Sequence, residues 1–444
     1  MKRLIETIKN IFKIEDLRRR ILYTLGLVLI YRFGSQVVIP GINPEALSNL
    51  ADATSGGGLV GLLNIFSGGA FGNASVFALG VMPYISASIV IQLLGMVIPY
   101  FQKLQKEGES GRRKINQLTR YLTIIILIPQ AIAYIASLPT AFNIPEAAFV
   151  MGHKNALFIA VAMMTLMAGT MFVMWLGEKI TDKGIGNGVS LIIMVGIVAS
   201  LPFALAAEFK DRVIDMVGGG PIMFIVEILI WFLVFMASIA LVQAVRKIPV
   251  QYAKRIVGNK QYGGVRQYIP LKINAANVMP IIFAQALMMI PMLFAGKEWA
   301  QGFVTTFMNT NGFWHNFVFA LLVIAFTYFY TAVTVNPNQM AEDMKRNGGF
   351  IPGVKPGKKT VDYIDTVMTR ITLPGSIFLA FVAIMPAFAT KLGINQQFSL
   401  FFGGTSLLIL VGVILDTLKQ IESHLLMRHY DGLMKTGRIK GRNG

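Results

Sequence analysis

The chain has 444 residues, of which 55% are hydrophobic and only 14% are charged, and its mean hydropathy is +0.61. This composition excludes a soluble globular protein and predicts a polytopic membrane protein, while the absence of cysteine excludes disulfides and thiolate chemistry. Four scattered histidines leave little for a metal site, and the net charge of +18 must lie outside the hydrocarbon, facing anionic lipid, RNA or an acidic partner.

The predicted elements begin with a basic amphipathic helix at residues 1–20, which lacks the apolar stretch of a cleavable secretion signal. Apolar runs of about 18 to 23 residues then predict ten membrane spans. The spans are residues 21–40, 75–99, 121–138, 155–176, 188–206, 221–243, 274–295, 316–336, 371–390 and 400–418. A basic tail follows at residues 419–444.

Lys and Arg are distributed unevenly between the two sides of this ten-span pattern. The segments on one side hold 34 of the 40 Lys and Arg residues, and those on the other side hold five. The basic segments are residues 1–20, 100–120, 177–187, 244–273, 337–370 and 419–444. The positive-inside rule therefore predicts that both termini are cytosolic, and one span more or fewer would scramble the pattern.

A short apolar stretch, residues 62–71, precedes the second predicted span. It is shorter than the roughly 20 residues that cross a bilayer, yet it is too apolar for a hydrated loop. Gly68 and Gly69 interrupt it and Gly72 follows it, and irregular backbone at membrane depth persists only inside protein or beside a watery cavity. We interpret the stretch as a re-entrant segment beside a pore. The alternative is an amphipathic hairpin on the outer surface without a gating role.

Two cytosolic loops are too long to be simple connectors. Residues 244–273 carry seven cations, no acid and three tyrosines, with Gly263-Gly264 as a predicted turn. Residues 337–370 repeat this pattern with Gly348-Gly349 and a PGVKPG turn. Such loops indicate docking platforms for RNA or an acidic protein. The alternative is that their charge serves only topology and lipid contact.

Enzyme signatures such as HExxH, GxSxG and Walker A do not occur in the sequence. The GIGNG run at residues 184–188 has no preceding strand, so it predicts a glycine-lined helix start instead of a phosphate loop. Arg32, Glu227 and Asp416 are isolated ionisable groups in different spans. We interpret them as anchors between helices or at the interface, because an ion-coupled transporter needs a chain of such groups.

The centres of the predicted spans are apolar. An apolar constriction excludes water and ions by dewetting, whereas flexible Ile and Val side chains can part for something wide. This favours a gated conduit for a bulky, chemically varied substrate such as an unfolded polypeptide. The competing class of protein is a solute transporter with a five-plus-five inverted repeat. The alternative for the aliphatic residues is that they face lipid, as most Ile and Val residues of membrane helices do. An intramembrane enzyme has no candidate nucleophile or metal cluster.

Eight collinear motifs extend this interpretation. They are ALGVMPYISAS at 78–88, KEGESGRRK at 106–114, GTMF at 169–172, WLGE at 175–178, GIGNG at 184–188, YAKR at 252–255, PLK at 270–272 and FGGTS at 402–406. Together they resemble the SecY family, the channel subunits of the bacterial protein translocon, from the N-terminal helix to the tail. The resemblance implies an all-α fold of ten transmembrane helices in two inverted halves, residues 21–206 and 207–418, around an hourglass pore.

The resemblance also implies roles for individual residues. The plug would lie at about residues 61–74 and include Leu62, Leu63, Ile65, Phe66, Gly68, Gly69 and Phe71. The pore ring would comprise Val81, Ile85, Val189, Ile193, Ile282 and Ile409. A lateral gate for signal sequences would use Ser86, Gln130 and Asn274, which could equally make routine hydrogen bonds between helices.

The two basic loops would bind the ribosome or the SecA motor through Lys254, Arg255, Lys345, Arg346 and Lys355. Lys355 departs from the family, which usually has arginine before this Pro-Gly, and lysine lacks the planar fork for two-point contacts. The further partners implied are the SecE and SecG subunits, rRNA, nascent chains and lipid, in the bacterial inner membrane. We expect no catalysis and no cofactor, so a partner must supply the energy.

Overall fold

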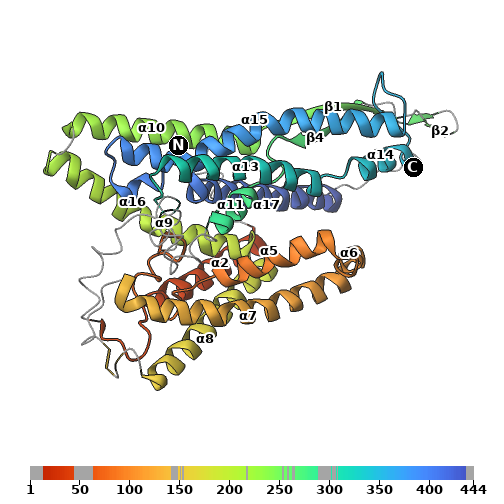
Figure 1. Cartoon of the computed structure of the whole chain (residues 1–444). Helices are drawn as coiled ribbons and strands as arrows, with labels where there is room; N and C mark the ends of the chain where they lie inside the picture. Colours follow the sequence, from red (N-terminus) through yellow and green to blue (C-terminus); the bar gives the residue numbers. More distant parts are fainter. Residues whose placement is uncertain are drawn as a thin grey trace. The chain divides into compact units, whose positions relative to one another are not determined.

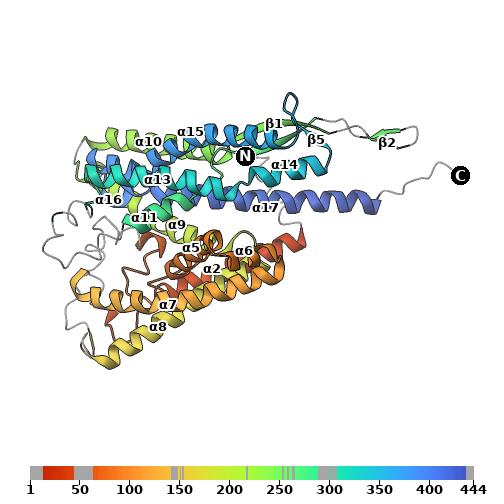
Figure 2. The ribbon, with the colours of Figure 1, turned by 45° about the vertical axis from the view of Figure 1, so that its right-hand side comes forward.

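The computed structural model describes residues 14–44, 64–141, 149–150, 152, 155–216, 219–252, 255–257, 260–262, 266–288, 302, 307 and 309–436. The chain divides into two compact units. Unit 1 comprises Met1–Phe203 and Val413–Gly444, and unit 2 comprises Ala204–Gly412. Both units are built mainly of helices (Figures 1 and 2).

Unit 1 is a helical bundle around α7 (Glu109–Ala141). Its other helices are α2 (Glu15–Gly34), α5 (Met82–Val97), α6 (Pro99–Lys106), α8 (Ala156–Lys183), most of α9 (Gly188–Phe209) and the C-terminal part of α17 (Gly404–Thr436). Helix α7 packs against α5, α6 and α8, and α2 packs against α8 (Figure 1). The re-entrant stretch lies within this unit.

Unit 2 contains the end of α9, the start of α17 and the long helices α10, α13 and α15. Its elements are the π-helical turn η3 (Lys210–Ile214), α10 (Gly220–Gln243), β1 (Val245–Tyr252), β2 (Arg255–Val257), β3 (Lys260–Tyr262), β4 (Arg266–Lys272), α11 (Met279–Met288), α13 (Phe313–Thr334), α14 (Pro337–Arg346), β5 (Gly349–Phe350), α15 (Lys358–Lys391) and α16 (Gln396–Ser399). Helix α13 packs against α15 and α11, and α10 packs against α15 (Figure 2).

Each of the ten predicted spans falls on a helix, and the polytopic helical fold is confirmed. Within the described ranges, seven helices are long and apolar enough to cross a membrane, or eight if the bent pair α5 and α6 forms one span. The bend follows from Pro99, which starts α6 and keeps Ile98 extended. The count of ten transmembrane helices stays a prediction.

Two helices begin later than the hydropathy pattern predicts. The run from Ser75 is a series of turns up to Val81, and α5 begins at Met82 with Pro83 in its first turn, where the missing N–H costs nothing. The seventh predicted span, residues 274–295, starts with turns that include Asn277 at φ 52°, so α11 begins only at Met279. Residues 289–295 of that span lie outside the described part of the chain.

A small antiparallel sheet supplements the helices. Strand β1 pairs with β4 from Val245 to Gln251, and the last two residues of β1 pair with β5. Pro249 and Pro270 fit this sheet, because β5 does not reach Pro249 and β4 is an edge strand. Both loops were predicted from the sequence, but none of these strands was.

Candidate functional site

The re-entrant segment, defined here as residues 64–74, forms one helical turn followed by a series of tight turns. Gly68 and Gly69 adopt φ values of +64° and +91°, the left-handed region in which only glycine is free of strain. The Asn64 side chain accepts a hydrogen bond from Gly72 N at 2.8 Å and so closes the segment on itself. The predicted glycine break is therefore confirmed, whereas Leu62 and Leu63 lie outside the described residues.

Three side chains from neighbouring helices donate hydrogen bonds to backbone carbonyls of this segment. The Tyr31 hydroxyl donates to Ser67 O at 3.1 Å, and Arg32 Nη1 donates to Gly68 O at 2.8 Å, both from α2. The Tyr134 hydroxyl of α7 donates to Phe71 O at 2.6 Å. Backbone carbonyls at membrane depth need protein partners, and these donors supply them.

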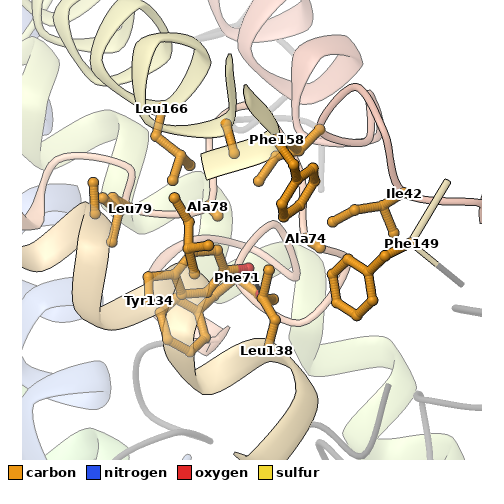
Figure 3. Close-up of a cluster of buried hydrophobic side chains, with 14 of the residues drawn as sticks. Ile42, Phe71, Ala74, Ala78, Leu79, Tyr134, Leu138, Phe149, Phe158 and Leu166 are labelled. Carbon is orange, nitrogen blue, oxygen red and sulfur yellow. Dashed lines mark hydrogen bonds between the residues drawn. The ribbon is translucent and has the colours of Figure 1, made fainter. Parts of the chain in front are cut away.

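The C-terminal part of the segment lies in an apolar cluster of unit 1 (Figure 3). The Phe71 ring packs against Tyr134 with 4.8 Å between ring centroids. Ala74 O accepts a hydrogen bond from Ile39 N at 2.9 Å, and Val38 and Ser75 form an isolated antiparallel bridge, so backbone contacts continue the attachment. The cluster consists of Ile39, Ile42, Phe71, Ala74, Ala78, Leu79, Leu127, Ala131, Tyr134, Ile135, Leu138, Phe149, Phe158, Ala162 and Leu166.

The N-terminal part of the segment approaches α9 closely through its backbone. A Cβ atom on Gly68 would lie 2.8 Å from the Cα atom of Gly196, and one on Gly196 would lie 2.8 Å from Phe66 O. Both distances are too short for a real Cβ contact, so this approach requires glycine on both sides. Ile65 and Phe66, which precede Gly68 in the segment, are both buried.

The six pore-ring positions are divided between the two units. Val81 caps the start of α5 and Ile85 follows in its first turn, while Val189 and Ile193 lie on α9 in unit 1. Ile282 lies on α11 and Ile409 on α17 in unit 2. Gln285 and Thr405 join these last two helices by a hydrogen bond of 3.4 Å. Convergence of all six on one axis stays a prediction.

The three gate positions differ in their surroundings. The Ser86 hydroxyl donates to Met82 O of its own helix at 3.1 Å, and Gln130 is half-buried on α7. Asn274 is 3% exposed in the turn before α11, and among the described residues its Oδ1 atom has no hydrogen-bond partner. A buried, unpaired amide oxygen costs about 1 to 3 kcal/mol. Within the described part of the chain, Asn274 Oδ1 therefore does not make the routine interhelix hydrogen bond.

The GIGNG run is a helix start, as predicted, because α9 begins at Gly188. Its N–H groups are taken up by side chains of the protein: Gly188 N donates to Thr181 Oγ1 and Gly186 N donates to Gln420 Oε1, both at 2.9 Å. Ile185 N donates to Thr24 Oγ1 at 3.2 Å. This turn joins α2, α8 and α17 within unit 1 and presents no anion cradle.

The two predicted docking loops form one platform. Gln251 and Tyr252 of β1 pair with Phe350 and Gly349 of β5, which joins residues 244–273 to residues 337–370. Beneath the strands, a shared apolar cluster draws on both loops and on α15. The buried members of the cluster are Ile248, Val250, Leu271, Met344, Ile351, Ile364 and Met368.

The cationic positions lie around this platform. Lys345 and Arg346 are exposed in the last turn of α14, where positive charge suits the negative end of the helix dipole. Lys355 is exposed in the PGVKPG turn, whose Gly353 and Gly357 have φ values of +85° and +98°. Arg255 starts β2, and Lys254 lies outside the described residues.

Gly349→Val is expected to separate the two loops, because a Cβ atom at Gly349 would lie 2.9 Å from Cε1 of the Tyr252 ring. Limited trypsin digestion should then cut residues 337–370 roughly tenfold faster, which corresponds to about 1.4 kcal/mol of local stability. Phe350→Val is the control, since it trims an exposed side chain of the same strand. Equal cleavage rates in the two variants would contradict the joined platform.

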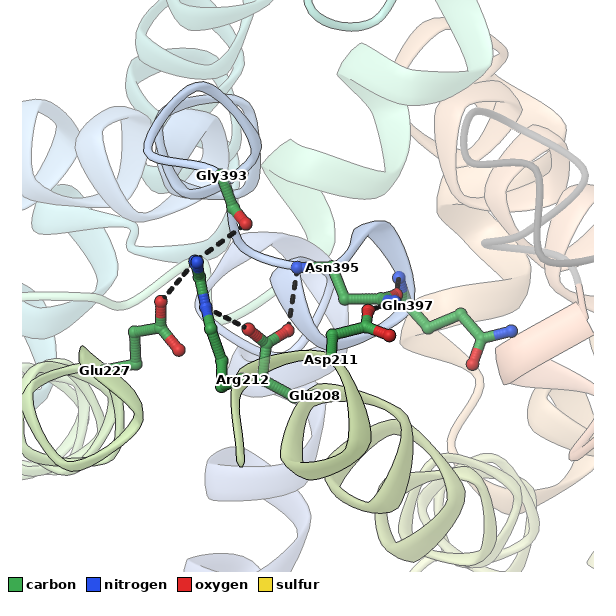
Figure 4. A network of polar contacts seen from close by, with 7 residues as sticks. All are labelled: Glu208, Asp211, Arg212, Glu227, Gly393, Asn395 and Gln397. Carbon is green, nitrogen blue, oxygen red and sulfur yellow. Dashed lines mark hydrogen bonds and ion pairs between the residues drawn. The ribbon is translucent and has the colours of Figure 1, made fainter. Parts of the chain in front are cut away.

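A buried ionic network lies in unit 2 where the sequence analysis expected an outer loop (Figure 4). Arg212 of η3 contacts Glu208 of α9 at 3.1 Å and Glu227 of α10 at 2.7 Å, and all three side chains are at most 3% exposed. Arg212 Nη2 also donates to Gly393 O at 2.7 Å. Glu227 is an anchor, as predicted, but it is not isolated.

The connection after α15 completes the network through Asn395. Its backbone N–H donates to Glu208 Oε2 and its Nδ2 atom donates to Asp211 Oδ2, both at 2.7 Å (Figure 4). The sequence signal for this network was the spacing of Glu208 and Arg212, four residues apart on a helical segment. Within the described ranges, no three His, Cys, Asp or Glu side chains are arranged to hold a metal ion.

Comparison with known proteins finds relatives that match most of the chain. The SecY family model matches residues 75–418. The protein translocase subunit SecY of Halalkalibacterium halodurans is 46% identical over 438 residues, which cover 97% of this chain and 99% of that protein. The same subunit of Streptomyces scabiei is 44% identical over 434 residues, covering 96% and 98%.

Solved structures show the same fold at lower identity. A protein-conducting channel matches with a TM-score of 0.62 and 17% identity over 92% of this chain and 93% of that one. A SecY protein whose plug domain stabilises the closed channel matches with a TM-score of 0.61 and 17% identity over 92% of both chains. Sec61 in a canine ribosome–channel complex matches with a TM-score of 0.59 and 16% identity, covering 92% and 93%.

Proposed function

This chain belongs to the SecY family, and from that premise we propose how its residues perform the family's function. It is the pore-forming subunit of a protein-conducting channel, which moves unfolded secretory polypeptides across the membrane and releases transmembrane segments into the bilayer. The two inverted halves, residues 21–206 and 207–418, would surround the pore.

The way in which the re-entrant segment is held within unit 1 is the main observation that supports this proposal. The segment is too short to span a bilayer, yet it is enclosed in unit 1 and held there through three of its own carbonyls. A solute transporter binds substrate with side chains at mid-membrane, whereas this segment fills space with backbone turns and apolar side chains. We therefore assign residues 61–74 as the plug of the channel.

The pore ring would seal the channel around a threaded chain. Its six proposed members are all aliphatic and β-branched: Val81, Ile85, Val189, Ile193, Ile282 and Ile409. Such a constriction excludes hydrated ions by dewetting and makes no demand on the sequence of the polypeptide. Aliphatic side chains can also part and close without breaking hydrogen bonds.

The lateral gate would open beside α5, α7 and the turn before α11, which carry Ser86, Gln130 and Asn274. The unpaired Oδ1 atom of buried Asn274 supports a switching role, because a polar atom without a partner in one state gains from a state that supplies one. A signal sequence would stabilise the open gate by burying its own apolar face there.

The joined platform would dock a translating ribosome or the SecA motor through Lys254, Arg255, Lys345, Arg346 and Lys355. The canine Sec61 channel and a yeast Ssh1 complex are ribosome-bound, and both share this fold. We further propose that SecE and SecG accompany the chain in the bacterial inner membrane, with both termini in the cytoplasm. Energy for transport would then come from SecA or from translation.

A stalled nascent chain should crosslink to a photoreactive residue placed at Ile85 or Ile282.

Ile409→Asn should also raise ion leak by roughly tenfold or more and let defective signal sequences pass, because a tenfold change needs the barrier to fall by only about 1.4 kcal/mol. Ile414→Asn, at a half-exposed position of the same helix, is the matched control. Absence of crosslinks, together with small-solute flux in proteoliposomes, would favour the transporter instead.

A further inference from the structure

We propose that the re-entrant segment is held by two different attachments, a releasable latch and a permanent base. Tyr31 and Arg32 of α2 form the latch on Ser67 and Gly68, and Tyr134 of α7 forms the base on Phe71. This inference rests on the proposed function, since it specifies how the plug of that channel opens. Tyr31, Arg32 and Tyr134 are positioning residues that act through the segment.

The base combines a hydrogen bond with extensive apolar packing. Phe71 and Ala74 both belong to the apolar cluster of unit 1 described above, in which Ala74 is fully buried (Figure 3). Withdrawing this end would expose the Phe71 ring, break the 2.6 Å bond from Tyr134 and part the backbone bond from Ile39. Each of these changes is unfavourable, so the chain from Phe71 onward stays in place when the rest moves.

The latch is polar and directional. Arg32 makes a charge-assisted bond of 2.8 Å to Gly68 O, the stronger class of hydrogen bond in proteins. Tyr31 is fully buried, and its ring stacks on Phe77 with 6.0 Å between centroids, so its hydroxyl is a fixed donor for Ser67 O. Arg32 is only partly buried, and its long side chain can keep its charge solvated after Gly68 leaves.

The contact with α9 explains why this end can be released. Gly68 and Gly196 meet backbone to backbone, so neither of these two residues has a side chain that interlocks with the other. Departure of this end breaks the two latch bonds, together with the bonds that Gly72 N and Phe71 N donate to Asn64 Oδ1 and Ser67 Oγ, and it uncovers Ile65 and Phe66. The latch then sets how readily a signal sequence dislodges the plug.

The absence of cysteine allows a direct test, because a single introduced thiol is the only reactive one. Ile65→Cys reports on the latch end and Ile39→Cys reports on the base, and both replace a buried isoleucine. The full chain with its partner subunits is treated with a maleimide in membrane vesicles. Labelling rates are then compared in backgrounds that lack one donor.

In the Ile65→Cys protein, Arg32→Gln should raise the labelling rate by roughly tenfold, in line with the loss of a bond from a charged donor. The same change should leave Ile39→Cys labelling unaltered. Tyr134→Phe should raise labelling of Ile39→Cys, whereas Tyr31→Phe should raise only that of Ile65→Cys. Arg113→Gln is the control, because Arg113 is 80% exposed and lies near the start of α7, far from Tyr134 in sequence.

The proposal is overturned if Arg32→Gln leaves Ile65→Cys labelling unchanged, or if it accelerates both sites equally, as general loosening would. If Arg32→Gln is not inserted, Tyr31→Phe removes one hydroxyl only and carries the same test. Labelling requires no transport, so the two hypotheses can fail separately. Suppose that labelling becomes faster, but no ion leak appears and protein export does not depend on this chain. That result would support the latch and refute the channel.

Discussion

Arg212→Met is expected to lower the free energy of unfolding by about 3 to 5 kcal/mol, the usual cost of removing one partner from a buried ionic pair. Arg212 is the cation that Glu208 and Glu227 share, and all three side chains are at most 3% exposed (Figure 4). Methionine fills similar space but leaves two carboxylates facing each other. It also removes the donor to Gly393 O, which ties down the end of α15.

Thermal unfolding of the purified chain, followed by tryptophan fluorescence, measures this effect. Trp231 is a suitable reporter, because it lies on α10 of the same unit and its Nε1 atom donates to Phe401 O at 3.0 Å. Arg113→Met, at an exposed position, should change stability by about 0.5 kcal/mol at most. If the Arg212→Met protein is as stable as this control, the network does not contribute to the free energy of unfolding.

A second comparison separates charge from packing. Adding Glu208→Gln and Glu227→Gln to Arg212→Met should recover most of the lost stability, because the uncompensated carboxylates are then gone. If the loss came from the shape of the arginine side chain instead, the triple variant would be no more stable than the single one. Coupling among the three sites is expected, since they are in direct contact.

The features that sequence predicted well are those that depend on neighbouring residues. Apolar length and the distribution of Lys and Arg placed a helix at every expected span, because the bilayer imposes both patterns locally. Gly68 and Gly69 marked the break in the re-entrant segment, and Gly188 marked the start of α9. Helix starts at Met82 and Met279 were missed, since hydropathy does not distinguish a turn from a helix.

The features that sequence missed are formed by residues far apart in the chain. Pairing of Tyr252 with Gly349 joins the two basic loops, and nothing in either loop alone specifies the other. Arg212 follows a predicted span and looked like an ordinary charge of an outer loop until Glu227 was placed beside it. Tyr31 and Tyr134 looked like ordinary residues of membrane helices, and only the fold brings them to the carbonyls of the re-entrant segment.

Gly188→Ala is the second change with a large expected effect. A Cβ atom at Gly188 would lie 1.9 Å from Gly177 O and 2.7 Å from the Cβ atom of Ile180, so α8 and α9 could not keep their present approach. Small residues permit such close crossings in membrane proteins. We expect a loss of about 2 to 4 kcal/mol in unfolding free energy, measured by the same fluorescence assay.

The control for Gly188→Ala is Gly26→Ala, because Gly26 lies inside α2 and a Cβ atom there meets nothing within 4 Å. Alanine is the better helix former by about 1 kcal/mol, so this control should be neutral or slightly stabilising. Gly188→Ala should also displace Val189 and Ile193, and hence raise ion leak through the proposed ring. If the two variants had equal stability and equal ion leak, α8 and α9 could move apart at little cost in free energy. Helix α9 could then not hold Val189 and Ile193 in fixed positions of the proposed pore ring.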